Sequence, residues 1–182
     1  MLSEQEAWEI LNTAEQICSA VVVSEAVERM AREISTELAG RRPLVLPVMG
    51  GSVVFAGQLL PLLRFPLEFD YLHASRYRNT TQGGMIQWKV MPAVPLRERV
   101  VLVLDDILDE GETLAAIRER MLHEGVAAFY SAVLADKEIG RPKPISADFV
   151  GVKLPNRYVF GCGMDVKGAW RNLPGIYAVK EE

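Results

Sequence analysis

Residues 100–113 have the sequence VVLVLDDILDEGET, which joins an apolar run to a cluster of acidic side chains. The run from Arg99 to Asp105 lacks polar alternation, as expected for a strand that is covered on both faces of a parallel sheet. Thr113 begins a helical pattern that we expect to continue to about Glu124 and to end at Gly125. The stretch therefore predicts a buried strand, a tight turn and a helix, with the acidic side chains where the strand ends.

This strand end is a candidate ligand site. Ligands of open α/β sheets bind in the crevice beyond the carboxyl ends of the strands. Backbone N–H groups at the start of the helix would suit a phosphate, and the hydroxyl of Thr113 adds a donor. Asp105 and Asp106 are placed to accept hydrogen bonds from a ribose diol. A helix cap among solvated acids is the plain alternative, but three acids within five residues exceed what capping needs.

The rest of the chain alternates helical patterns with short apolar runs. Helices are predicted over 4–17 with Ser3 as N-cap, over 25–39 following Ser24 and ending at Gly40, and after Gly51 through residue 63. Strands are predicted over 43–48, 67–73, 85–90, 126–134, 149–152 and 176–179, and residues 74–85 are expected to form a mobile loop. This order predicts a parallel α/β sheet flanked by helices. The first 40 residues lack strand signals and are expected to cap the sheet.

Composition narrows the class of protein. The 182 residues are 49% hydrophobic and carry a net charge of −4, which fits a soluble globule and argues against a non-specific nucleic-acid binder. No apolar run reaches the roughly 18 residues that span a membrane, and the acidic N-terminus lacks a signal-peptide pattern. Cys18 and Cys162 have no metal-ligand spacing and are expected to be buried, reduced thiols. We therefore expect a cytoplasmic protein with no membrane or nucleic-acid partner.

Residues 100–113 resemble the phosphoribosyl pyrophosphate (PRPP) signature of type I phosphoribosyltransferases: a hydrophobic strand, two acids, two apolar residues, Asp, a variable residue, Gly, a variable residue and Thr. Walker A and Rossmann fingerprints do not occur. The resemblance implies an α/β fold with a mostly parallel central sheet flanked by helices, and a small hood over the active site. It also implies that the ribose phosphate is bound by Asp105, Asp106, Asp109, Glu110, Gly111, Glu112 and Thr113.

From about residue 44 to its C-terminus, the chain is similar to the hypoxanthine-guanine phosphoribosyltransferase family. The similarity implies that Lys137 donates to the purine 6-oxo group, a carbonyl that adenine lacks. It implies that Tyr158 stacks on the base and that the backbone of Val159 meets the purine edge. It assigns Mg²⁺ to Asp165, Asp105 and Asp106, and pyrophosphate to Arg171. Taken singly, Lys137, Tyr158 and Arg171 are more often a solvated charge, a core residue and a surface ion pair.

Four positions depart from the family pattern. Met49 stands where many members have Lys or Arg, but Met49 and Gly50 are implied to bind pyrophosphate through backbone N–H groups, often with a cis peptide. Arg76 replaces a Ser in the loop that closes over the reaction centre, and it is expected to reach pyrophosphate. Glu110 and Glu112 are acids beside the 5′-phosphate, which requires their side chains to point away from it.

The resemblance implies a Mg²⁺-dependent purine-salvage enzyme that transfers ribose 5-phosphate from PRPP to N9 of hypoxanthine or guanine. Asp109 is the candidate catalytic group and would accept the N7 proton of the base. Residues 1–182 are expected to form one domain, with 1–40 and 155–182 contributing to the hood, and the family suggests a homodimer or homotetramer. The alternatives are a regulator that senses PRPP or nucleotides, a phosphoribosyltransferase for another base such as xanthine, and an interaction module with an incidental acidic loop.

Overall fold

The computed structural model describes residues 2–76 and 86–180. Its centre is a five-stranded sheet in the order β3-β2-β6-β7-β8, and every neighbouring pair is parallel. These strands are β3 (Glu68–Phe69), β2 (Leu44–Pro47), β6 (Val100–Leu108), β7 (Ala128–Glu138) and β8 (Phe149–Pro155). The predicted parallel α/β sheet is confirmed, and β6, which carries the acidic cluster, is its middle strand.

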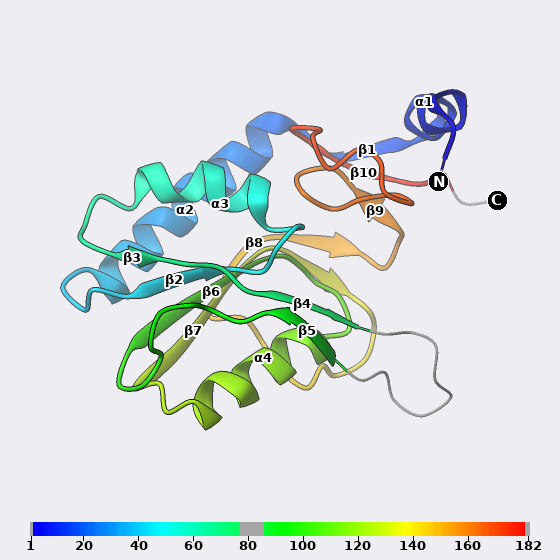
Figure 1. Ribbon diagram of the computed structural model, residues 1–182. Helices are drawn as coiled ribbons and strands as arrows, with labels where there is room; N and C mark the ends of the chain where they lie inside the picture. Colours follow the sequence, from blue (N-terminus) through cyan, green and yellow to red (C-terminus); the bar gives the residue numbers. More distant parts are fainter. Residues whose placement is uncertain (1, 77–85, 181–182) are drawn as a thin grey trace.

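Helices cover both faces of this sheet (Figure 1). Val45, Leu102 and Leu134 pack with α2 (Ala20–Leu38) and α3 (Val53–Leu59) in one core cluster. Leu46 and Val103 pack on the other face with α4 (Glu112–His123). The side chains of a strand point alternately to its two faces, so neighbouring apolar residues enter different cores. The apolar runs without polar alternation follow from this arrangement.

A second sheet is formed by the two ends of the chain. Its strands are β1 (Glu15–Cys18), β10 (Ile176–Ala178) and β9 (Val159–Phe160), paired antiparallel in the order β1-β10-β9. Beside it lies α1 (Glu4–Thr13), which begins with the expected Ser3 cap in a reciprocal capping box with Glu6 (Figure 1). The indole nitrogen of Trp170 donates to the carbonyl oxygen of Ala7 at 2.8 Å, which ties α1 to the segment that follows β9.

The N-terminal expectations need two corrections. The helix expected over 4–17 ends at Thr13, and β1 follows it, so the statement that the first 40 residues lack a strand is wrong. They do not extend the central sheet: among residues 2–76 and 86–180, the strand partner of β1 is β10. The second helix begins at Ala20 rather than after Ser24, because the side chain of Ser19 accepts a hydrogen bond from the N–H of Val22. The β-branched start of α2 is tolerated since Val23 is fully buried.

Strand boundaries differ elsewhere. Residues expected to begin a loop instead form β4 (His73–Arg76), which pairs antiparallel with β5 (Ile86–Val90); residues 77–85 of the expected loop lie outside the described chain. The strand expected over 67–73 is reduced to β3 and an isolated bridge between Leu72 and Val48. The helical stretch to residue 63 is α3 followed by a 3₁₀ turn, Leu60–Leu62. Strand β9 was not expected, because two residues are too few to show the alternation of apolar and polar side chains that marks a strand.

The two cysteines are free and buried, as expected. Burial raises the pKa of the Cys162 thiol to about 11. Within the described residues, no helix combines the length and the apolar character that crossing a bilayer requires.

Candidate active site

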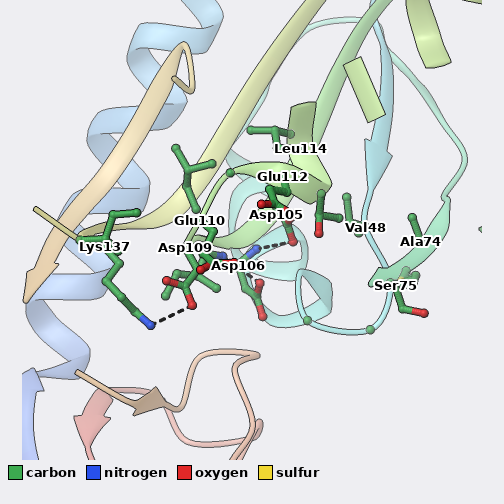
Figure 2. Close-up of a pocket in the computed structure, with 18 of the residues that line it drawn as sticks. Val48, Ala74, Ser75, Asp105, Asp106, Asp109, Glu110, Glu112, Leu114 and Lys137 are labelled. Carbon is green, nitrogen blue, oxygen red and sulfur yellow. Dashed lines mark hydrogen bonds and ion pairs between the residues drawn. The ribbon is translucent and has the colours of Figure 1, made fainter. Parts of the chain in front are cut away.

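A cavity of about 1010 Å³ lies at the carboxyl ends of β2, β6 and β7 (Figure 2). This is the edge at which parallel sheets bind ligands. The structure brings eleven of the predicted site residues to its wall: Met49, Gly50, Asp105, Asp106, Asp109, Glu110, Gly111, Glu112, Thr113, Lys137 and Arg171. They come from three strand ends and from the segment after β9, so the fold assembles residues that are far apart in the sequence.

The turn between β6 and α4 has the shape of an anion site. Gly111 precedes α4 with a φ of 84°, in the left-handed region that favours glycine. A Cβ atom at this position would lie 3.3 Å from Lys143 Cβ and 3.3 Å from Pro144 Cδ, so the turn packs tightly on the loop behind it. Among the described residues, no side chain caps the start of α4. Its first backbone N–H groups therefore lack the side-chain acceptor that an N-cap supplies, and they can serve a phosphate.

Asp105 and Asp106 form a close pair on β6, with Oδ1 of Asp105 accepting from the N–H of Asp106 at 3.0 Å. Burial raises the pKa of Asp105 well above its usual range, and the neighbouring charge of Asp106 raises it further. Burial also raises the pKa of Asp106, although hydrogen bonds from Asp105 and from the N–H of Ile107 oppose that rise. The pair therefore holds a proton more readily than two solvated aspartates, until a ligand stabilises both charges.

Lys137 and Asp109 face one another across the cavity wall (Figure 2). Lys137 Nζ lies 3.0 Å from Asp109 Oδ2, with the lysine side chain 11% exposed and the aspartate 45% exposed. Lys137 is thus not the solvated charge that an isolated lysine usually is. It comes from β7 and Asp109 from the turn after β6, and the parallel pairing of these strands brings the two side chains together.

The loop after β2 packs against the acidic pair. The peptide between Met49 and Gly50 is cis, as the family resemblance implied. A Cβ on Gly51 would lie 2.1 Å from Asp106 Oδ2, and a Cβ on Gly163 would lie 1.9 Å from the carbonyl oxygen of Gly51. Only glycines permit this close approach of the two loops to β6. Arg171 is held at the same place, since its Nη1 donates to the carbonyl oxygen of Gly163 at 2.5 Å.

Comparison with known proteins identifies the family. Residues 14–167 match the model of the phosphoribosyl transferase domain. The chain belongs to this family. It is 32% identical over 161 residues to a hypoxanthine-guanine phosphoribosyltransferase of Streptococcus pneumoniae, covering 88% of this chain and 89% of that protein.

Solved structures agree in fold. A hypoxanthine-guanine phosphoribosyltransferase of Bacillus anthracis superposes with a TM-score of 0.85 at 29% identity, over 91% of this chain and 98% of that one. A hypoxanthine-guanine-xanthine phosphoribosyltransferase superposes with a TM-score of 0.83 at 27% identity, over 93% and 99%. The predicted family and the type I phosphoribosyltransferase fold are confirmed.

Three predicted site residues lie away from the cavity wall formed by residues 2–76 and 86–180. Tyr158 is 56% exposed and its hydroxyl donates to the carbonyl oxygen of Asp165 at 3.4 Å. Val159 is buried in β9, paired with Ala178. The carboxylate of Asp165 pairs with Arg171 Nη2 at 2.5 Å and accepts from the N–H of Gly168 at 2.7 Å. The side chain of Arg76 lies outside the described part of the chain. The roles predicted for these four residues stay predictions.

The cavity also contains residues that sequence reasoning missed. Arg141 reaches the wall from the loop after β7 and pairs with Glu110 at 2.8 Å, while Asn156 reaches it from the turn after β8. His73 and Ser75 enter from β4. The one sequence signal for Arg141 was its position: it is a basic residue four positions after Lys137, in the polar segment that follows a predicted strand. For the others the signal lies in the topology and not in the local sequence.

The cavity contains carboxyl groups of the kind that bind Mg²⁺. Within the described residues, no three carboxylate, imidazole or thiol groups converge to hold a metal by themselves. Mg²⁺ is usually bound by one or two carboxylates together with substrate phosphates and water. Asp105 and Asp106 provide two partly buried carboxyl groups side by side at the cavity, and desolvation raises the pKa of both. They fit a magnesium site that is completed by a phosphorylated substrate.

Proposed function

We propose that the chain is a purine-salvage hypoxanthine-guanine phosphoribosyltransferase, which transfers ribose 5-phosphate from PRPP to N9 of hypoxanthine or guanine and gives IMP or GMP and pyrophosphate. The observation that carries the proposal is that Lys137 and Asp109, 3.0 Å apart, line the same cavity as the turn between β6 and α4, which resembles the PRPP signature. The family membership and the names of the relatives support the reaction.

The turn and α4 bind the ribose phosphate. The 5′-phosphate accepts hydrogen bonds from the backbone N–H groups that begin α4, with Thr113 adding its hydroxyl. The carboxylates of Asp105 and Asp106 accept from the two ribose hydroxyls. Glu110 pairs with Arg141, which offsets the charge of one of the two acids beside the phosphate.

Lys137 and Asp109 act on the base. In the ligand-free chain each satisfies the other, so base binding exchanges their pairing for two contacts to the purine. Lys137 donates to the 6-oxo oxygen, which adenine replaces by an amino group. Asp109 accepts the N7 proton as N9 forms its bond to the anomeric carbon and the bond to pyrophosphate breaks. The enzyme forms no covalent intermediate; it aligns the reactants and neutralises the leaving group.

Pyrophosphate lies between the loop after β2 and Arg171. The backbone of Met49 and Gly50 supplies N–H donors, and the guanidinium of Arg171, 43% exposed, turns from Asp165 to phosphate oxygens. Arg76 is a further candidate for this contact. Asp165, Asp105 and Asp106 are the candidate ligands of Mg²⁺, which neutralises the departing pyrophosphate when it is bound.

The second sheet and α1 form the hood of a single domain, with Tyr158 stacking on the base and the backbone of Val159 meeting its edge. Exposure supports the role of Tyr158, because an aromatic ring that is 56% exposed offers a face to a ligand. The two free thiols fit a reducing, cytoplasmic location. We infer a homodimer or homotetramer on family grounds, and no nucleic-acid partner for a chain of net charge −4.

Turnover of hypoxanthine, guanine, xanthine and adenine with PRPP and Mg²⁺ tests the function. IMP and GMP should form, adenine should not react, and EDTA should stop the reaction. Preference for xanthine is the second candidate, favoured by the similarity to a hypoxanthine-guanine-xanthine enzyme, and faster XMP formation would establish it. PRPP binding without turnover of any base would refute the enzyme and point to a regulator.

A further inference from the structure

Lys143 occupies a buried position behind the active site. It lies in the loop between β7 and β8, and its side chain is 12% exposed. Its ammonium donates to the carbonyl oxygen of Leu108 at 2.6 Å and pairs with Asp136 Oδ1 at 2.6 Å. A lysine side chain that is mostly removed from water needs partners for its charge, and these two contacts supply them.

The two partners of Lys143 each stand one residue before a site residue. Leu108 is the last residue of β6 and directly precedes Asp109, and Asp136 precedes Lys137 on β7. Leu108 and Asp136 are also register partners in the parallel ladder between these strands. Lys143 therefore links the ends of β6 and β7 one residue before Asp109 and Lys137.

The backbone of the same loop packs against the turn between β6 and α4, which is proposed to bind the 5′-phosphate. A Cβ on Gly111 would meet Lys143 Cβ and Pro144 Cδ, each at 3.3 Å, so the loop lies directly behind the start of α4. This contact depends on the path of the loop and not on the ammonium of Lys143. The ammonium binds the ends of β6 and β7, whereas the loop backbone packs against the turn between β6 and α4.

We propose that Lys143 is a positioning residue, which sets the separation of Asp109 and Lys137 by tying Leu108 to Asp136. The proposal rests on the function proposed above, because it matters for catalysis only if Asp109 and Lys137 engage the same base. Misplacement of a reacting group by about 1 Å can lower a rate by about 100-fold. Loss of the ammonium should therefore slow the chemical step and weaken base binding, while PRPP binding at the turn is preserved.

The variant Lys143→Met keeps the Cβ contact and the length of the side chain but removes the charge. We expect kcat/KM for hypoxanthine to fall by roughly 10- to 100-fold and KM for PRPP to change by less than about twofold. Lys153→Met is the matched control, since Lys153 forms an ion pair with Glu138 in which the two side chains are 69% and 63% exposed. It should leave both constants unchanged.

A double variant separates positioning from the cost of leaving the partly buried carboxylate of Asp136 without its cation. Lys143→Met with Asp136→Asn removes both charges, so the free energy of unfolding should recover while kcat/KM for the base stays low. Lys143→Arg, which retains the charge and donors, should recover part of the rate. Full recovery of activity in the double variant would overturn the proposal, because the defect would then come from the orphaned Asp136 alone.

Amide hydrogen exchange supplies a readout that does not depend on turnover. In Lys143→Met, exchange should rise in peptides covering residues 107–113 and 134–138 and stay unchanged in the Lys153→Met control. Unchanged exchange in both peptides would overturn the positioning role, even if the rate falls. If the wild-type protein turned over no base, the proposed function would fail, and with it the catalytic part of this inference; exchange would still judge the link between the strands.

Discussion

Replacing Asp109 by Asn separates the proposed catalytic role of this residue from its structural one. Asn keeps the size of the side chain and one oxygen that can accept from Lys137, so the buried ammonium retains a partner. The aspartate is 45% exposed, so solvent screens its charge, and exchanging it for an amide that still accepts from Lys137 should cost about 1 kcal/mol or less. We therefore expect Asp109→Asn to lower the free energy of unfolding by no more than about 1 kcal/mol.

The effect on catalysis should be much larger. Proton transfer by a positioned side chain contributes about 10²- to 10⁴-fold, and at 1.36 kcal/mol for each tenfold this is about 2.7–5.4 kcal/mol of transition-state stabilisation. KM for PRPP should change little, because Asp105, Asp106 and the start of α4 remain. The loss in catalysis therefore exceeds the loss in stability by at least about 1.7 kcal/mol, which makes the two contributions distinguishable.

The assay is single-turnover formation of IMP with enzyme in excess over hypoxanthine, since product release limits kcat in many enzymes and would hide a slower chemical step. Urea unfolding measures stability on the same preparations. Glu138→Gln is the control for a carboxylate-to-amide change, because Glu138 is 63% exposed and should affect neither quantity. A single-turnover rate for Asp109→Asn within about threefold of wild type would refute the assignment of Asp109 as proton acceptor.

Three further substitutions test the site. Lys137→Met should weaken hypoxanthine binding by about 10- to 100-fold, the value of a charged hydrogen bond, with a smaller effect on PRPP, as titration calorimetry of each ligand would show; equal losses would contradict the base contact. Asp105→Asn should be more stable than wild type at pH 7.5 and lose that advantage toward pH 4, because a carboxyl with a raised folded-state pKa costs stability as pH rises through that pKa. Urea titrations at both pH values check this, and a constant difference would exclude it. Gly51→Ala should cost about 1–3 kcal/mol, since its Cβ would meet Asp106 Oδ2 at 2.1 Å, whereas Gly57→Ala, with open space around it, should not destabilise the protein; equal unfolding midpoints would show that the loop can relax.

The sequence predicted the strand, turn and helix of residues 100–123 well because the parts of this segment are contiguous. The apolar run of β6, the acids, Gly111 and Thr113 lie within 14 residues, so strand, turn and helix each follow from the local pattern. Lys137 and Arg171 had no such local signal. They were found through the family resemblance, and the structure places both at the cavity wall.

The features that were missed depend on partners far away in the chain. Strand β1 is four residues long and gains its hydrogen bonds from β10, about 160 residues later, so nothing near Glu15 marks it as a strand. The role of Lys143 is similar: one basic residue in a polar loop predicts a solvated charge, and only the folded chain brings it to Leu108 and Asp136. Local patterns predict elements, whereas contacts between elements require the topology.

The acidic groups at the site raise the question of how it accepts an anionic substrate. Most of them have a partner or a raised pKa within the chain: Asp109 pairs with Lys137, Glu110 with Arg141 and Asp165 with Arg171, and burial raises the pKa of Asp105. Under the proposed function, substrate binding therefore replaces ion pairs within the chain by contacts to the substrate. When Arg171 turns to pyrophosphate it leaves the carboxylate of Asp165 without its cation, and ionised Asp105 and Asp106 add negative charge nearby. Free PRPP would increase this imbalance, whereas its metal complex brings the cation that the carboxylates then need. If the chain acts as proposed, the site should prefer the magnesium complex of PRPP to the free anion, because the metal supplies the cation that Asp165 loses when Arg171 turns to pyrophosphate.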